Sequence, residues 1–270
     1  MKKAAAYPYI VWMLLFIIIP LVLIVYYSLT VDGVLSFANF ARAFEPIYLT
    51  VLIDSFIIAV ISTVICFVLG YPVAYIMARL EFRSNNFLIF LFLVPMWMNF
   101  LMRTYAWLTI LEENGFLNTI LVAVGLPRIY ILYTDVAVTL GMVYNFIPFM
   151  ILPIYTVLKK IDKSIVEAAQ DLGANSVQVF LRVVFPLSLP GVVSGTTMVF
   201  LPSVTTFVIA DLLGGNKTQL IGNVIEQQFL LVNDWSFGSA LSVMLMVVIL
   251  ITMNIFSRVD NRDGEEGALY

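Results

Sequence analysis

The chain has 270 residues, of which 62% are hydrophobic and only 11% are charged, whereas soluble domains carry about 25% charged residues. It contains no histidine and a single cysteine, Cys66, which excludes histidine-based metal sites, histidine-dependent nucleophilic triads and an intramolecular disulfide. The net charge of −3 indicates no particular partner, and no feature predicts binding to nucleic acid.

Six long stretches of the sequence contain no Asp, Glu, Lys or Arg. Each has at least 19 residues, and a helix needs roughly 20 apolar residues to cross the ~30 Å hydrocarbon layer of a membrane. Core helices of a soluble protein are a poor alternative at these lengths. We therefore predict an all-α membrane protein with six transmembrane helices. The predicted spans are residues 4–31, 55–78, 84–102, 136–158, 183–210 and 235–257.

The first span follows Lys2 and Lys3, as the apolar part of a secretory signal does. It is about twice the usual length of such a segment, and no small-x-small cleavage site closes it. We therefore expect a retained first helix, in which Pro20 is tolerated as prolines are in other membrane helices.

The positions of the basic residues predict the orientation. Ten of the fourteen Lys and Arg residues fall at the two termini or in the loops after the second and fourth spans. The positive-inside rule makes that side cytoplasmic, so both termini are expected in the cytoplasm. The cytoplasmic loops are then 79–83 and 159–182, and the outer segments are 32–54, 111–135 and 211–234.

The 159–182 loop contains the only extensive amphipathic pattern outside the spans. Its apolar residues recur at helical spacing and predict one apolar helix face. Gly173 suits the left-handed position that ends a helix, and Asn175 or Ser176 suits the start of a second one. The residues of the predicted apolar face are Ile161, Ile165, Ala168, Ala169 and Leu172.

Two functions are open for the first of these helices on spacing alone. The small pair Ala168 and Ala169 keeps its middle slim, which lets the surface of another protein approach the backbone closely. Alternatively, the helix lies on the membrane surface, and Glu167 only completes the capping box Ser164-x-x-Glu167.

The sequence Glu167-Ala168-Ala169, followed by Gly173 and then by Pro186 or Pro190, resembles the EAA loop of binding-protein-dependent ABC importer permeases. This resemblance implies a coupling helix, including Ile165 and Leu172, that docks in a groove of a cytoplasmic ATPase subunit. It also implies the type I ABC importer transmembrane fold in a bacterial inner membrane. The strictest motif has one proline at this point, so Pro186 and Pro190 both stay open.

The resemblance covers most of the chain and divides it into three parts. Residues 1–50 are the N-terminal tail, first helix and outer segment, 51–257 the permease domain, and 258–270 the cytoplasmic C-terminal tail. No nucleotide site is expected in this chain, because Asn216 replaces the glycine that a phosphate-binding loop needs before Lys217. The resemblance implies that ATP and Mg are bound by partner ATPase subunits, that the chain is not itself an enzyme, and that it holds no cofactor.

Three stretches near the C-terminus, 210–217, 220–229 and 234–238, resemble the permeases of spermidine/putrescine importers. That resemblance implies a second related permease, two ATPase copies and an extracytoplasmic polyamine-binding protein. The alternatives are the same machine for another solute, such as thiamine, iron or sulfate, and a stand-alone secondary transporter or channel. The second alternative is disfavoured because the halves show no convincing repeat and the six spans contain no Asp or Glu.

A polyamine pathway needs carboxylates that attract ammonium groups and aromatic rings that accept them. Asp211 and Glu226 are the carboxylates that we expect to take part, because the outer segments are rich in acidic residues. The alternative for the acidic residues is ordinary solvated loop charge and contacts with the binding protein. The alternative for the polar residues is hydrogen bonding between helices. The polar and aromatic candidates are Trp97, Asn99, Arg103, Tyr105, Tyr144, Asn145, Ser203, Thr205 and Thr206.

Overall fold

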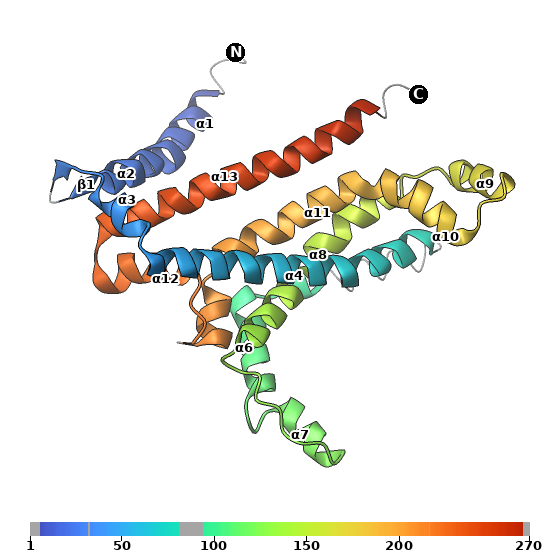
Figure 1. Cartoon of the computed structure of the whole chain (residues 1–270), viewed down its shortest axis with the longest axis horizontal. Coiled ribbons are helices and arrows are strands. Elements are labelled where there is room, and N and C mark those ends of the chain that lie inside the picture. Colours follow the sequence, from blue (N-terminus) through green and yellow to red (C-terminus); the bar gives the residue numbers. More distant parts are fainter. Residues whose placement is uncertain (1–5, 32, 81–93, 216, 267–270) are drawn as a thin grey trace.

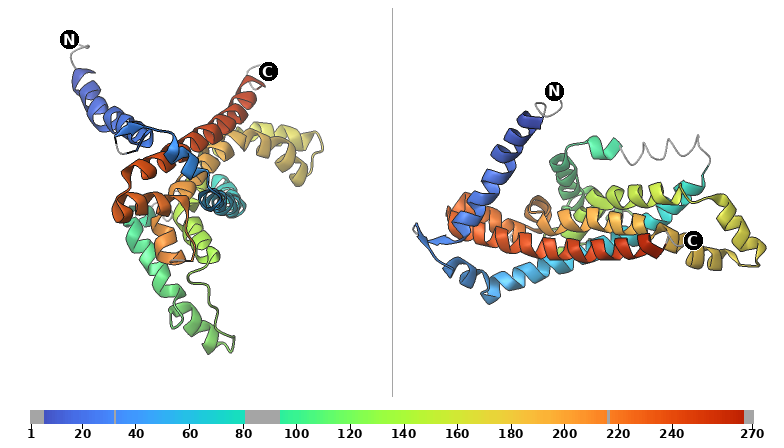
Figure 2. Two further views of the ribbon diagram at one scale, coloured as in Figure 1. Left: turned by 60° about the vertical axis from the view of Figure 1, so that its left-hand side comes forward. Right: turned by 90° about the horizontal axis from the view of Figure 1, so that it is seen from above.

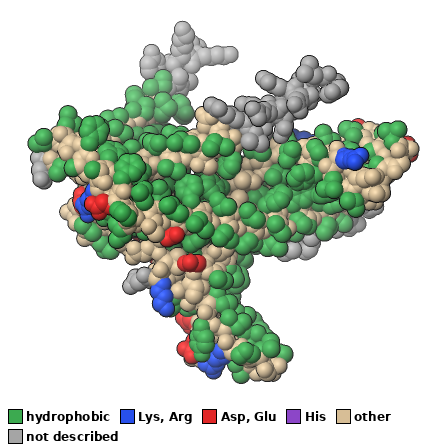
Figure 3. All heavy atoms as spheres, viewed as in Figure 1, with side chains coloured by type: hydrophobic (Ala, Val, Ile, Leu, Met, Phe, Trp, Pro, Cys, Tyr) green, Lys and Arg blue, Asp and Glu red, His purple; other side chains and the backbone are tan. Residues whose placement is uncertain are grey.

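The structure is a computed structural model that describes residues 6–31, 33–80, 94–215 and 217–266. Long helices run beside one another along the longest axis of the molecule, and short helices connect them at both ends (Figure 1). Hydrophobic side chains cover much of the bundle in the view of Figure 3, while charged side chains gather near its ends and on the projecting arm. This distribution fits a bundle that crosses a membrane.

The N-terminal helix is continuous but contains a wider π turn just before Pro20. Proline lacks the N–H that an α-helix needs at this point, and the wider turn accommodates it. Helix α2 packs on α13, whereas the N-terminal part projects away from the bundle (Figure 2). A short antiparallel hairpin and one helical turn follow. The elements are α1 (Ala6–Met13), η1 (Leu14–Ile18), α2 (Ile19–Ser28), β1 (Thr30–Val31), β2 (Val34–Leu35) and α3 (Ala38–Ala43).

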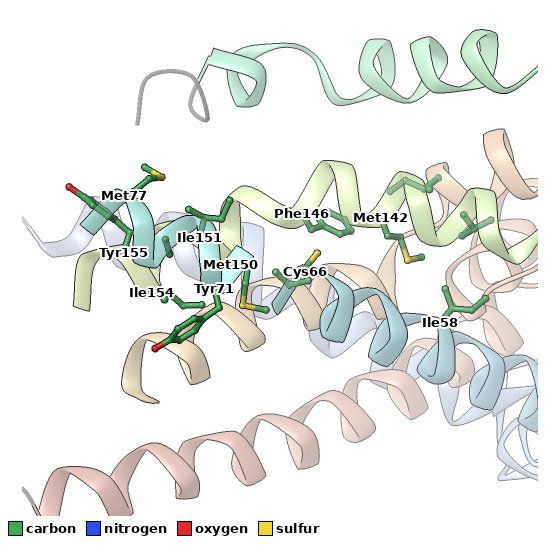
Figure 4. Close-up of a cluster of buried hydrophobic side chains, with 14 of the residues drawn as sticks. Ile58, Cys66, Tyr71, Met77, Met142, Phe146, Met150, Ile151, Ile154 and Tyr155 are labelled. Carbon is green, nitrogen blue, oxygen red and sulfur yellow. The ribbon is translucent and has the colours of Figure 1, made fainter. Parts of the chain in front are cut away.

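The centre of the bundle is formed by α4 (Pro46–Arg79), α8 (Asp135–Leu158) and α11 (Phe185–Thr205). Figure 4 shows Cys66 of α4 among the buried side chains of α8, including Met142 and Met150. These flexible thioether side chains fill the irregular space between the helices. The packing therefore fixes α4, α8 and α11 as the scaffold on which both ends are built.

Glycines bring α11 close to α8. A Cβ at Gly191 would lie 3.0 Å from the carbonyl oxygen of Pro153, and one at Gly195 would lie 3.1 Å from that of Met150. Small residues spaced four apart are a common means of close helix packing in membranes. The two helix backbones are thus in direct contact along this face.

The last helix, α13 (Trp235–Glu266), packs against α2, α3 and α11. At its start, the Arg42 guanidinium pairs with Asp234 at 3.0 Å and lies 3.9 Å from the ring centroid of Phe237. This contact fixes the N-terminal segment to the beginning of the last helix. Two shorter helices, α6 (Phe100–Leu111) and α7 (Phe116–Ala123), form an arm that projects from the bundle (Figure 1).

Short elements connect the long helices at the two ends of the bundle. At one end, α9 (Lys163–Asp171), α10 (Ser176–Val179) and η2 (Phe180–Val184) join α8 to α11. The other end holds the hairpin and the segment between α11 and α13. That segment consists of η3 (Ala210–Gly214), α12 (Ile221–Gln227) and η4 (Gln228–Val232).

Within the described residues, five helices are long and apolar enough to cross a membrane. They correspond to the predicted spans one, two, four, five and six. Residues 84–93 of the predicted third span lie outside the described residues. Its described remainder is not one continuous helix, because Asn99 caps α6 by accepting a hydrogen bond from the Leu101 amide at 2.8 Å. The five helices are Pro8–Ser28, Pro46–Arg79, Asp135–Leu158, Ser176–Thr205 and Trp235–Phe256.

Two predicted spans have limits that differ from those of the helices. Helix α4 begins at Pro46 and not at residue 55. It therefore includes Asp54, because a single charged residue does not end a helix. The fifth span begins earlier than residue 183, since the apolar helical stretch runs from Ser176 to Thr205. Its helix ends at Thr205, and the backbone of Thr206 is extended. Charge-free stretches therefore located the spans but not their ends.

Candidate functional site

The loop between α8 and α11 begins with a capped helix. The Asp162 carboxylate accepts a hydrogen bond from the Ser164 amide at 2.9 Å and caps α9. Hydrogen bonding to Ser164 lowers the pKa of Asp162, because it stabilises the ionised carboxylate. The capping box considered for Ser164 and Glu167 is therefore wrong, since Ser164 lies inside the first turn.

The end of α9 confirms the position expected for Gly173, whose φ is +86°. The Gly173 amide donates to the Gln170 carbonyl at 2.8 Å, and the Ala174 amide donates to the Ala169 carbonyl at 3.1 Å. These two bonds form a Schellman motif, which satisfies carbonyl groups that a helix end leaves free. Asn175 then caps α10 through a reciprocal pair of 2.9 Å bonds with Gln178.

The predicted apolar face of α9 is divided between two sides of the helix. Val166 and Ala169 pack against the central core, as does Ile161 before the helix. In contrast, 45% of Ile165 and 90% of Leu172 are exposed, with Ala168 exposed between them. The expectation that Ala168 and Ala169 share one face was therefore wrong, because α9 lies on the bundle with Ala169 inward. An exposed apolar stripe remains, formed by Ile165, Ala168 and Leu172.

Aromatic rings connect this loop to the central helices. Phe180 of η2 lies edge-on to Tyr75 at 5.4 Å and to Tyr71 at 5.7 Å, measured between ring centroids. The Tyr71 hydroxyl lies 2.8 Å from the Ser188 hydroxyl, which itself donates to the Phe185 carbonyl. Ser188 has only one proton, so Tyr71 is the donor to Ser188. These contacts join the loop to α4 and α11.

The predicted pathway residues on and before α6 are exposed. Trp97 is 79% exposed and Tyr105 is half exposed, while Asn99 acts as the helix cap described above. Arg103 of the same helix is buried, and its Nε has no hydrogen-bond partner within the described residues. The structure does not bring Trp97, Asn99 and Tyr105 into one cavity with the outer carboxylates.

A second group of predicted residues lies on α8. Tyr144 packs edge-on against Trp107 at 5.3 Å, and both line an apolar cavity of about 740 Å³ that extends to Asp135. Asn145 is buried and donates to the Gly141 carbonyl at 2.9 Å, a bond within α8 and not the hydrogen bond between helices that the alternative expected. Trp107 was missed by the sequence reasoning, because it lies beyond the charge-free stretch that ends at residue 102.

The end of the bundle with α12, which the sequence analysis expects to face outward, brings Thr205, Asp211 and Glu226 close together. A cavity of about 570 Å³ is lined by Thr205 and Glu226 and by the rings of Phe207 and Phe229. Burial raises the pKa of Glu226, and the neighbouring carboxylate of Asp211 raises it further. Of the other predicted residues here, Ser203 is buried and donates to the Val199 carbonyl, whereas Thr206 is only half-buried.

Asn223 holds this arrangement and was missed by the sequence reasoning. Its amide donates to the Asp211 carboxylate at 2.5 Å and to the Phe207 carbonyl at 2.9 Å, while its oxygen accepts from the Leu220 amide at 3.1 Å. Only 1% of Asn223 is exposed. No group of three His, Cys, Asp or Glu residues that could hold a metal ion is present in the part of the chain that the structure describes.

The sequence matches a known family of membrane proteins over most of its length. The family of inner-membrane components of binding-protein-dependent transport systems matches residues 67–262. The chain belongs to this permease family. The spermidine/putrescine transport system permease protein PotB of Salmonella typhimurium is 41% identical over 256 residues, which cover 92% of this chain and 89% of that protein. PotB of Escherichia coli K12 is 40% identical, covering 92% and 93% of the two chains.

Solved structures confirm the fold expected for such a permease. A chain of the bacterial alginate ABC transporter, in complex with a pentasaccharide-bound periplasmic protein, has a TM-score of 0.83 and 17% identity over 97% of this chain and 94% of its own. A chain of the MetNI methionine ABC transporter, in an inward-facing conformation, has a TM-score of 0.59 and 17% identity over 80% and 95%. The permease therefore has the type I ABC importer transmembrane fold.

Proposed function

We propose that this permease is a transmembrane subunit of an ATP-driven importer of polyamines and forms half of the translocation pathway. The observation that carries the proposal is 40% identity to PotB of Escherichia coli over nearly the full length of both chains. The outer cavity supports the choice of a cation, because Glu226 and two aromatic rings line it and Asp211 lies beside Glu226.

The chemistry of the outer cavity suits a linear polyamine. Ammonium groups are attracted to Asp211 and Glu226. Burial, and then the neighbouring Asp211 carboxylate, raise the pKa of Glu226, so a bound cation would offset the cost of its negative charge. The methylene segments and one ammonium group can lie on the rings of Phe207 and Phe229. A desolvated cation on an aromatic ring contributes about 2 kcal/mol.

The 159–182 loop supplies the coupling to ATP hydrolysis in this proposal. The exposed stripe of Ile165, Ala168 and Leu172 enters a groove on a cytoplasmic ATPase subunit, and Glu167 lies beside it. The complete importer then consists of this chain, a second homologous permease, two ATPase subunits that bind ATP and Mg, and an extracytoplasmic polyamine-binding protein.

The membrane orientation follows from the basic residues and is part of the proposal. The end of the bundle with α9 faces the cytoplasm together with both termini, and the end with α12 faces outward. A cysteine introduced by Gln170→Cys in a Cys66→Ala background should react with a membrane-impermeant thiol reagent only after the cytoplasmic face is opened. Labelling of intact cells from outside would contradict this orientation.

The substrate is tested by uptake of labelled spermidine and putrescine into vesicles that contain the assembled complex, with its binding protein supplied outside. We expect Asp211→Asn and Glu226→Gln to reduce uptake by roughly tenfold, the loss of about 1.4 kcal/mol of cation stabilisation. The matched control is Glu113→Gln, since Glu113 is an exposed carboxylate on the projecting arm. Transport of an anion or a neutral sugar without polyamine uptake would refute the substrate.

A further inference from the structure

A cavity of about 400 Å³ lies where α4, α8, α9 and η2 meet. Its charged and amide side chains are exposed, whereas its apolar side chains are half-buried or buried. The polar residues are Arg79, Lys159, Lys163, Glu167 and Gln170. The apolar residues are Tyr75, Ala78, Leu158, Ile161, Val166 and Val184.

The rim of this cavity is cationic. Three basic side chains line it together with one carboxylate, that of Glu167. Within the described part of the chain, neither Arg79 nor Lys163 forms an ion pair. The Arg79 guanidinium lies 4.2 Å from the ring centroid of Tyr75, which holds it at the rim. The cavity therefore favours an anion.

A smaller apolar cleft of about 260 Å³ lies beside the cavity on α4 and η2. Phe180, which lines the cleft, packs edge-on against Tyr75, which lines the cavity. Val68 and Leu181 of the cleft are more than half exposed on the surface of the bundle, where lipid chains lie in a membrane. The other residues of the cleft are Phe67, Tyr71, Pro72 and Phe185.

We propose that this cavity binds the phosphate group of an anionic phospholipid, with an acyl chain along the neighbouring cleft. Arg79 offers a planar guanidinium that matches phosphate oxygens, and Lys163 places a second charge at the start of α9. Basic pockets between helices on the cytoplasmic side bind lipid headgroups in this way. The proposal rests on the orientation given under the proposed function, and it makes the lipid a bridge between α4 and the coupling helix.

An acidic side chain of a partner ATPase is the competing occupant. It would satisfy the cationic rim, but it would leave the adjoining apolar cleft unexplained. An amphiphile fits both features, because its headgroup needs cations and its chain needs an apolar surface. The lipid is therefore favoured by the two features together.

The test is titration of the purified, assembled importer in detergent with dioleoyl-phosphatidylglycerol, followed by native mass spectrometry. We expect Arg79→Gln combined with Lys163→Gln to weaken lipid binding by about 25-fold, roughly fivefold for each basic residue removed. Lys160→Gln is the matched control, because it removes the same charge from the same loop but does not line the cavity. The control should change binding by less than about twofold.

Two further ligands test whether the site binds a lipid or a free phosphate ester, and a single variant tests for misfolding. Phosphatidylcholine should bind at least tenfold more weakly than phosphatidylglycerol, because it has no net charge. Glycerol 3-phosphate should also bind at least tenfold more weakly, because it has no acyl chain. Lys163→Gln alone guards against misfolding, because Lys163 is exposed in the first turn of α9; it should weaken binding by about fivefold.

The proposal is overturned if the double variant binds phosphatidylglycerol as tightly as Lys160→Gln does. It is equally overturned if glycerol 3-phosphate binds as well as the lipid, or if the double variant keeps the lipid but loses its ATPase subunits. Polyamine uptake is not measured in this experiment. A wrong substrate assignment would therefore leave the outcome unaffected.

Discussion

The two ends of the bundle are built in opposite ways. At one end, no residue of α9 is buried, and the helix depends on its caps and on a few inward contacts. At the other end, α12 buries Asn223, whose side chain joins three segments by hydrogen bonds. Ile221 of the same helix donates from its amide to the hydroxyl of Ser55 at 2.8 Å.

We interpret the end with α9 as a surface for a partner subunit and the end with α12 as part of the folded framework of this chain. The exposed stripe on α9 has apolar residues that we propose are covered by a partner subunit. The polar groups around α12 are already paired, so that region holds its geometry without a partner. Substitutions at the first end should therefore affect coupling, and those at the second should affect folding.

The largest expected effect tests the first half of this comparison. Ala168→Arg places a bulky charge within the exposed stripe, and an unpaired charge in a protein interface costs about 3 kcal/mol. Substrate-stimulated ATP hydrolysis should fall roughly a hundredfold, while membrane insertion is unchanged. Ala168→Ser is the control, because it changes the same position without adding bulk or charge. Normal transport by Ala168→Arg would show that the stripe is not a docking surface.

The next effect tests the second half of the comparison. Asn223→Ala removes three hydrogen bonds at a buried site and leaves their partners unpaired, which should lower the free energy of unfolding by about 2–4 kcal/mol. Thermal unfolding of the purified protein in detergent measures the loss. Gln227→Ala, one turn further along α12 and half-buried, should change stability by less than about 0.5 kcal/mol. Equal effects of the two variants would show that the network adds nothing.

A smaller effect is expected where α9 ends. The space around Gly173 is open, so the only cost of a side chain there comes from the left-handed backbone. Gly173→Val should destabilise the end of α9 by about 1–2 kcal/mol, and Gly173→Asn should cost less, because asparagine adopts this conformation more readily. Hydrogen exchange at the Ala174 amide measures the opening. Equal exchange in the two variants would contradict a backbone origin.

The smallest effect concerns pH at the outer carboxylates. Because the folded protein raises the pKa of Glu226 above its ordinary 4.5, the protonated form is favoured by folding. Stability is then highest below pH 4.5 and falls as the pH rises through the raised pKa. Glu226→Gln should abolish this decline, which we expect to be within about 0.5 kcal/mol, since the site is largely solvated and screened by salt. Unfolding midpoints between pH 4 and 8, with and without spermidine, provide the measurement.

Features that depend on residues close together in the sequence were predictable. The fourth span, predicted as 136–158, matches α8 (Asp135–Leu158) because charges bound it directly. Gly173 was predictable because a left-handed helix end favours glycine whatever its surroundings. The family and fold were recognisable because the Glu167-Ala168-Ala169 pattern and its spacing to Gly173 are local in sequence.

Features that depend on packing were not predictable. The inward position of Ala169 and the outward position of Ala168 are set by how α9 rests on the bundle, which helical periodicity does not contain. Asn223 joins segments up to 16 residues apart in sequence. Asn99 interrupts an apolar stretch because its side chain caps the following helix, a competition with the backbone that hydropathy does not reveal.

The close contact at Gly191 and Gly195 determines how a push on the loop is transmitted. The loop joins α8 to α11, and a Cβ added at Gly191 or Gly195 would lie only 3.0–3.1 Å from backbone oxygens of α8. In the proposed coupling, we expect α8 and α11 to move together when α9 is displaced, because their backbones are packed directly on each other at these glycines. The outer segment is attached to this pair, since η3 packs on α8 at Gly141. In the proposed importer, we therefore expect a displacement of α9 to reach the cavity beside Glu226 through packed helices.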